Sequence, residues 1–250
     1  MTLVLAIACD DGIVIGSDSA FSEAEIGTKH PSAKIKQLCD CPILYGASGD
    51  VGLAQKVDEA LKAYKPKTLL KQIRSGIKSL VVLELKASIE QHVPYPNPSF
   101  HLPPAVILLF AGVLDGHPWI LEIERDARDT LYDESMGNFA AIGSGKLLAH
   151  AFFRPHFGTK RTLRTGKVLA YRVLDDAISI AGAGLALPLH VHTISGGGTV
   201  TEIGEAEMTE LNNTVNAWRE IERDSLGRAL SPAADEPALA IPTPRVDPAG

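Results

Sequence analysis

The sequence predicts an α+β fold of four layers, in which two antiparallel sheets pack face to face between outer layers of helices. Three observations favour this αββα sandwich. Short strands come in pairs that tight turns connect, and helical periodicity appears in pairs of segments. Strands and helices do not alternate one by one, as they would in a parallel doubly wound sheet. The expected order is strands, two helices, strands, two helices, strands and a last helix.

The chain opens with four predicted strands. Apolar residues alternate over 3–9 and 12–18 around an Asp-Asp-Gly sequence, which is typical of a β-hairpin with a tight turn. Two further strands are expected near 33–38 and 42–47.

Two helices follow these strands. Apolar residues in 49–64 share one helical face, with Ser48 as the expected N-cap and Asp50 favourable in the first turn. Pro66 is suited to the first position of a helix and begins the second one, which is expected to reach about His92.

A proline-rich segment leads to a second group of strands. Residues 105–114 and 118–124 form a hairpin joined at Asp-Gly, and strands near 129–133 and 138–142 complete the group.

The remaining elements are two helices, two strands and a last helix. The helices are expected at 146–157 and 165–182, and the strands at 188–195 and 199–203 around a Ser-Gly-Gly-Gly turn. The last helix, over 205–224, carries a stripe of apolar residues on one face.

The chain is predicted to hold one domain and a tail. Residues 1–226 form the αββα domain, because neither an internal repeat nor a second group of elements is evident. Residues 227–250 are rich in proline and alanine and are expected to be disordered.

Composition excludes several classes of function. The 250 residues carry a mild net charge of −6, and the basic residues form no run that would suit a nucleic acid. No apolar stretch reaches membrane-spanning length, and the N-terminus does not have the pattern of a secretory signal. The three cysteines are too few and wrongly spaced for a disulfide framework or a zinc site. We expect a cytoplasmic protein without a metal or cofactor.

The second residue offers nucleophilic chemistry. Removal of Met1 would leave Thr2 with a hydroxyl and a free α-amine on one residue. An α-amine has a pKa of about 7.7–8.0, so it can act as a base toward the hydroxyl near neutral pH. Such a site also needs a cation, a carboxylate to hold the cation, and a backbone N–H for the oxyanion.

The sequence supplies a candidate for each of these needs. Asp18 ends the second strand and can return to the level of Thr2, and Lys34 lies at the start of the third strand. Gly46 has no side chain to keep its N–H from a substrate carbonyl. Each residue alone is more simply a turn carboxylate, a solvated lysine or a bend, so their joint spacing carries the prediction.

Together these residues resemble the proteasome β-subunits, and more closely their bacterial peptidase relatives among the N-terminal-nucleophile hydrolases. The pattern is Thr at the mature terminus, Asp in "SD", Lys in "AKI", Gly in "YGASGD" and Ser144 in a "GSG" that follows an apolar strand. With the "HVHTI" strand, the resemblance covers roughly residues 2–205.

The resemblance implies a role for each matching position. The implied catalytic residues are Thr2 as nucleophile and base, Lys34 as the cation, Asp18 as its anchor, Gly46 as the oxyanion donor, and Ser144 as a partner of the terminal amine. The implied walls of the substrate pocket are Phe21, Ser22, Lys36, Leu44 and Ser48. The backbones of Ser22 and Gly46 would pair with an extended substrate peptide.

The resemblance also implies an activity and partners. A threonine-type endopeptidase would cut polypeptides inside a homo-oligomeric ring or stacked rings, with an unfoldase ATPase as a possible partner and neither nucleic acid nor membrane involved. Two alternatives stay open: a catalytically weak or inactive ring or scaffold subunit of the same fold, and a small-amide hydrolase.

One part of the family pattern is missing. An Asp-x-x-Ser motif is expected just before the "HVHTI" strand, but those positions hold Ala183 and Ala186. Asp176 and Ser179 have the right spacing but lie seven residues early, about 10 Å along a helix. The support around Thr2 must therefore differ from the family pattern.

Two weaker signals have structural explanations. The "GSGK" sequence is not a phosphate-binding loop, because Ala140 and Leu147 stand where the motif needs Gly and Ser or Thr. His190 and His192 share a strand face, but without a nearby third ligand a structural role is favoured over a metal site.

Overall fold

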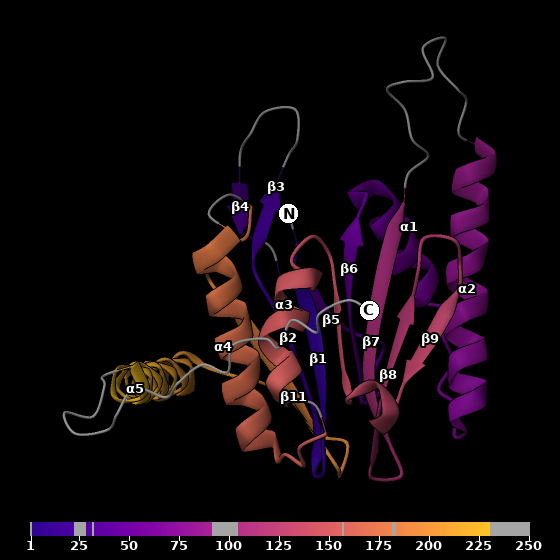
Figure 1. Cartoon of the computed structure of the whole chain (residues 1–250). Coiled ribbons are helices and arrows are strands. Elements are labelled where there is room, and N and C mark those ends of the chain that lie inside the picture. The colour runs from indigo at the N-terminus through magenta and orange to yellow at the C-terminus, as the bar shows by residue number, and fades with distance from the viewer. Residues whose placement is uncertain are drawn as a thin grey trace, which may run out of the picture.

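The computed structural model confirms the four-layer sandwich (Figure 1). Two five-stranded antiparallel sheets lie face to face, and helices cover their outer sides. The residues that the structure describes are 2–22, 29–31, 33–91, 105–156, 158–181 and 184–230.

The first sheet has the strand order β10-β1-β2-β11-β12. Its strands are β1 (Val4–Cys9), β2 (Gly12–Ser17), β10 (Phe139–Ile142), β11 (His190–Ser195) and β12 (Val200–Glu202). Val4 pairs with Ile142 of β10 on one side and with Ser17 of β2 on the other. The beginning of β1 therefore lies inside the sheet rather than at its edge.

The second sheet has the order β5-β6-β7-β8-β9. Its strands are β5 (Ile35–Gln37), β6 (Ile43–Gly49), β7 (Val106–Leu114), β8 (His117–Ile123) and β9 (Asp129–Tyr132). A separate two-stranded sheet joins β3 (Ala20–Ser22) to β4 (Lys29–Pro31), which the sequence analysis did not predict.

Helices form the outer layers. They are α1 (Val51–Leu61), α2 (Leu70–Gln91), α3 (Lys146–Phe153), α4 (Leu163–Ala181) and α5 (Glu205–Leu230), with 3-10 turns at Glu134–Met136 and Arg154–His156. α1 and α2 cover the second sheet, α3 and α4 cover the first, and α5 packs against α4 (Figure 1).

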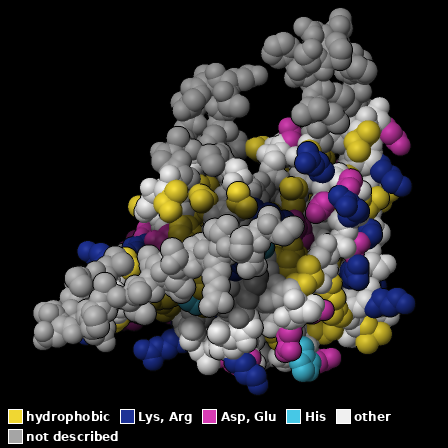
Figure 2. Space-filling view, in the orientation of Figure 1, with side chains coloured by type: hydrophobic (Ala, Val, Ile, Leu, Met, Phe, Trp, Pro, Cys, Tyr) yellow, Lys and Arg dark blue, Asp and Glu magenta, His cyan; other side chains and the backbone are white. Residues whose placement is uncertain are grey.

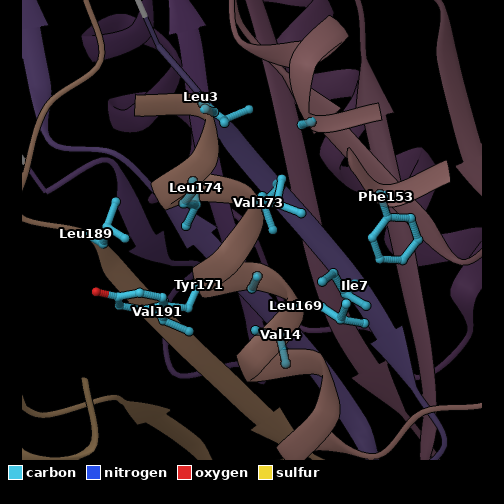
Figure 3. Close-up of a cluster of buried hydrophobic side chains, with 14 of the residues drawn as sticks. Leu3, Ile7, Val14, Phe153, Leu169, Tyr171, Val173, Leu174, Leu189 and Val191 are labelled. Carbon is cyan, nitrogen blue, oxygen red and sulfur yellow. The ribbon is translucent and has the colours of Figure 1, made fainter. Parts of the chain in front are cut away.

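Strand alternation divides the core into layers. Leu3, Leu5 and Ile7 face α3 and α4, in a cluster that also holds Leu174 (Figure 3). Val4 lies in the layer between the two sheets. Successive side chains of a strand point to opposite faces, so β1, whose residues are all buried, contributes to both layers.

The start of α1 differs from the prediction. Asp50, not Ser48, is its N-cap, because Asp50 Oδ1 accepts a hydrogen bond from Leu53 N at 2.7 Å. β6 continues to Gly49, so Ser48 is still part of a strand.

The start of α2 also differs. This helix begins at Leu70 rather than at Pro66. A Cβ on Gly76 of α2 would stand 3.3 Å from the ring of Tyr64, which is buried. The chain must turn to bring α2 back over Tyr64, and the residues around Pro66 serve that turn.

The last helix is longer than predicted. α5 runs to Leu230, beyond both its expected end at 224 and the expected start of the tail at Gly227. Residues 220–229 are all exposed, so this end of α5 extends past the surface that the rest of the helix packs on. The predicted tail beyond Leu230 and the proline-rich segment before β7 lie outside the described residues.

α2 carries more basic than acidic side chains. Figure 2 shows Lys and Arg side chains gathered over this helix. Arg74 and Lys78 of α2 form ion pairs with the buried carboxylate of Asp129 and so attach α2 to β9. None of the described helices is both long enough and apolar enough to cross a membrane.

Candidate active site

The start of β1 is held by the turn between β10 and α3. Thr2 N donates to Ser144 Oγ at 3.1 Å, and Thr2 O accepts from Gly145 N at 3.2 Å. In the full chain Thr2 N is an amide nitrogen. Removal of Met1 would turn this nitrogen into an α-amine that lies beside the Ser144 hydroxyl.

One carboxylate oxygen connects Lys34 to the residue after Thr2. Asp18 follows β2 and is fully buried, and its Oδ1 accepts from Leu3 N at 2.8 Å and from Lys34 Nζ at 2.6 Å. Lys34 immediately precedes β5, so this ion pair joins the two sheets beside Thr2.

The Lys34 side chain is only 9% exposed. Burial lowers the pKa of Lys34 below its usual value, and the hydrogen bond and charge of Asp18 oppose this shift. A buried lysine with a depressed pKa beside a potential nucleophile is typical of functional sites.

The close approach of the turn to Thr2 requires glycine at position 143. Gly143 has a φ of +94°, and a Cβ there would stand 2.1 Å from Thr2 O. Both the left-handed backbone and the lack of space exclude a larger residue.

Gly46 lies where the sheets touch, since a Cβ there would stand 2.8 Å from Val4 Cγ1. The strand register, however, directs its N–H away from the expected oxyanion site. Asp50 N donates to Ala105 O at 2.8 Å on the β7 side. Backbone groups alternate sides along a strand, so Gly46, four residues earlier, also directs its N–H toward β7.

The neighbouring odd-numbered residues direct their backbone groups to the opposite side of β6. Leu38 N donates to Ile43 O at 2.9 Å on that side, which agrees with the alternation. Ile35, the first residue of β5, pairs with Gly46. Ala47 and Gly49 lie beyond this last pair, so they are better placed than Gly46 to face a substrate.

The residues expected to line the substrate pocket do not all lie close to one another. Leu44 is 2% exposed in the core between the sheets, and Lys36 pairs with Asp58 of α1. Ser48 does lie near the β10–α3 turn, because its Oγ is 3.1 Å from the position of a Cβ on Gly143. Phe21 and Ser22 belong to β3, but their side chains lie outside the described part of the chain.

At Ala186, the one described position of the missing Asp-x-x-Ser motif, the backbone carbonyl is hydrogen-bonded to Ser19. Ala186 O accepts hydrogen bonds from Ser19 N at 3.0 Å and from Ser19 Oγ at 3.3 Å. Asp176 pairs with Arg172 and with Arg219 of α5, on the outer side of the first sheet. Ala183 lies outside the described residues.

The sequence analysis missed one charged group near the turn. Glu122 of β8 is 2% exposed, and Lys146, two residues after Ser144, donates to it at 2.8 Å. A single glutamate in the otherwise apolar strand "WILEI" was the available signal.

The paired histidines of β11 face a carboxylate on the neighbouring strand. Glu202 Oε1 lies 3.7 Å from His190 Nδ1 and 3.9 Å from His192 Nε2. Among the described residues, no group of three or more His, Cys, Asp or Glu side chains could hold a metal ion.

The αββα sandwich of two five-stranded antiparallel sheets is the fold of the N-terminal-nucleophile hydrolases. Within this class the chain belongs to the proteasome subunit family, because the family model described as "Proteasome subunit" matches residues 2–185. The resemblance seen in the sequence is therefore confirmed.

Solved structures with the same fold include two Anbu proteins. An Anbu (Gly-1) mutant from Hyphomicrobium sp. strain MC1 is 14% identical, with a TM-score of 0.72 over 91% of this chain and 97% of that chain. Anbu, an ancestral beta-subunit from Yersinia bercovieri, is 15% identical, with a TM-score of 0.71 over 94% of this chain and 100% of that chain. No curated protein matches the sequence.

Proposed function

We propose that this chain is a threonine-type endopeptidase whose nucleophile is Thr2, made N-terminal by removal of Met1. The observation that carries the proposal is the arrangement around Thr2. Its nitrogen contacts Ser144 Oγ, and the buried Lys34–Asp18 pair is bonded to the next residue along the chain.

The proposed reaction begins when the neutral α-amine of Thr2 takes the proton from its own Oγ1, directly or through a water. Oγ1 then attacks the scissile carbonyl and forms a tetrahedral intermediate. The amine returns the proton to the leaving amino group as the C–N bond breaks, which leaves an ester on Thr2. Water activated by the same amine hydrolyses this ester.

The surrounding residues would support these steps. Ser144 orients the amine, and the Lys34 cation, held by Asp18, stabilises the developing negative charge on Oγ1. Backbone N–H groups on the free side of β6, at Ala47 and Gly49, would stabilise the oxyanion in place of Gly46.

Family membership supports a homo-oligomeric assembly as the setting of this reaction. We propose a ring or stacked rings in the cytoplasm that enclose the site and admit unfolded polypeptides, with an unfoldase ATPase as the partner that would supply them. Enclosure would protect folded proteins from an endopeptidase.

The test combines intact mass with covalent labelling. We expect the mature protein to lack Met1 and a peptide epoxyketone to label Thr2. Lys34→Ala should abolish labelling, and circular dichroism should show that the variant, although less stable, is still folded. Lys36→Ala is the matched control: it removes a lysine two residues away, whose partner is Asp58, and should label at the wild-type rate.

The outcomes separate the alternatives. Retained Met1 and no labelling would contradict the proposal and favour an inactive ring or scaffold subunit. Labelling of Thr2 without cleavage of unfolded polypeptides would instead favour a small-amide hydrolase.

A further inference from the structure

An ion pair between a buried carboxylate and a half-exposed lysine connects the second sheet to the turn that contacts Thr2. Glu122 of β8 lies two residues after Ile120, whose side chain is in the layer between the sheets, so Glu122 points into the same layer. Its Oε1 accepts from Lys146 Nζ at 2.8 Å, and its Oε2 accepts from Tyr132 OH.

Lys146 is an unexpected residue for its position in α3. It is the first residue of the helix, where a positive charge is opposed by the helix dipole. The preceding residue, Gly145, makes no side-chain capping bond. The start of α3 therefore has neither a favourable charge nor a side-chain cap, whereas the contact with Glu122 ties it to the other sheet.

The same turn makes both contacts with Thr2. Lys146 N donates to Gly143 O at 3.0 Å, which closes the turn. Ser144 and Gly145, inside this turn, hold Thr2 N and Thr2 O. A shift of Lys146 would therefore move both contacts at once.

We propose that the Glu122–Lys146 pair is a positioning device that holds Ser144 and Gly145 against Thr2. The inference rests on the proposed function and extends it, because neither residue touches the reacting atoms. The pair would also support the surroundings of Thr2 in a chain that has alanines where the family pattern has Asp-x-x-Ser.

If the Glu122–Lys146 pair only stabilised the fold, its loss would not act specifically on the turn that contacts Thr2. Removing the cationic partner of a buried carboxylate that has no second cation leaves an uncompensated charge and destabilises the fold. The test must therefore separate a general loss of stability from a local change at the turn.

The experiment compares Lys146→Met with Lys78→Met. In both cases a lysine loses its contact with a buried carboxylate: the exposures are 39% for Lys146 and 2% for Glu122, and 40% for Lys78 and 7% for Asp129. Lys78 lies on α2, away from the turn, and Asp129 keeps Arg74 as a partner. Lys146→Arg retains the cation and serves as the rescue variant.

Two measurements are made on each full-length variant. The first is hydrogen exchange in the segment from Gly143 to Lys146, which does not depend on activity. The second is peptide hydrolysis, resolved into kcat and KM. Misplacing a catalytic contact by about 1 Å can cost about a hundredfold in rate, so we expect Lys146→Met to lower kcat by at least about tenfold with little change in KM.

The expected pattern is faster exchange at the turn and lower kcat for Lys146→Met, wild-type values for Lys78→Met, and recovery with Lys146→Arg. Equal behaviour of the two Met variants, or an unchanged turn in Lys146→Met, overturns the inference. If Lys146→Met does not fold, the double variant Glu122→Gln/Lys146→Met removes the unpaired charge. This double variant should fold but still show faster hydrogen exchange at the turn and a low kcat.

These results remain distinct from failure of the proposed function. An inactive, unlabelled wild type would contradict the peptidase proposal, but faster exchange at the turn in Lys146→Met alone would still support the positioning role. An active wild type whose kcat is insensitive to Lys146→Met would contradict the positioning role alone.

Discussion

At the scale of single residues, the surroundings of a lysine, and not its residue type alone, decide whether it belongs to the candidate site. Lys34 and Lys36 are two residues apart, yet Lys34 is bonded to the buried Asp18 and Lys36 to the surface helix α1. Burial lowers the pKa of Lys34 below its usual value. This contrast makes the two alanine variants a sharp test of which cation serves Thr2.

A pH prediction also belongs to this scale. Burial lowers the pKa of His150 below its usual value, and the positive charge of Lys146 lowers it further. The unfolded chain therefore binds more protons than the folded one between the folded pKa and about 6.5. Stability that is present above pH 6.5 should be lost as the pH falls through this window.

His150→Phe tests this prediction. It removes the titrating group but can keep an aromatic contact with Phe139, whose ring centroid lies 5.1 Å from that of His150. Urea unfolding at pH 7 and pH 5 should show a smaller loss of stability for the variant than for wild type. His156 and His192 also have lowered pKa values, so part of the loss should remain. An unchanged loss would rule out His150 as a contributor.

At the scale of elements, α5 is attached to α4 through a few specific contacts. The Arg172 guanidinium lies 3.9 Å from the ring centroid of Trp218, and its two terminal nitrogens donate to the Glu222 carboxylate at 2.9 and 2.6 Å. Beyond this point the helix is exposed. Trp218 therefore marks the last aromatic anchor of α5 on the domain.

Trp218→Ala should loosen α5 and destabilise the protein by about 1–3 kcal/mol, because it removes the cation–π contact and buried aromatic surface. Hydrogen exchange should rise in α5 more than in α4. Ile221→Ala is the control: this side chain is 65% exposed on the next turn, so its effect should stay within about 0.5 kcal/mol. Equal effects of the two variants would contradict the anchoring role.

At the scale of the whole molecule, the candidate site exists only where the two sheets dock. Thr2 precedes β1 and Asp18 follows β2 of the first sheet, and Lys34 precedes the first strand of the second sheet. Any change that separates the sheets should therefore disrupt the Lys34–Asp18 pair as well as the core.

Assembly is the prediction that belongs to this scale. We expect mass photometry of the full chain to show a closed assembly larger than a dimer, since cyclic closure is the usual result of repeated head-to-tail contacts. A chain that ends at Leu230 should assemble equally well, because the proline- and alanine-rich segment beyond it has little apolar surface to contribute. A monomer or dimer in both samples would remove the proposed chamber.

The sequence by itself determined the features that depend on local patterns. Alternating and helical periods predicted the hairpins, the order of the elements and the four layers, since each period follows from backbone geometry. Thr2, Asp18 and Lys34 were candidates from the residues themselves, and the resemblance to the proteasome β-subunits added Ser144. The fold brings these four residues together.

Only the tertiary structure decided what depends on which segments become neighbours. The N–H of Gly46 points toward β7 because of the register of β6, which the glycine itself does not reveal. The pairing of Glu122 with Lys146 joins segments 24 residues apart on different layers. Such contacts leave no local periodicity, because they arise from the docking of one sheet on the other.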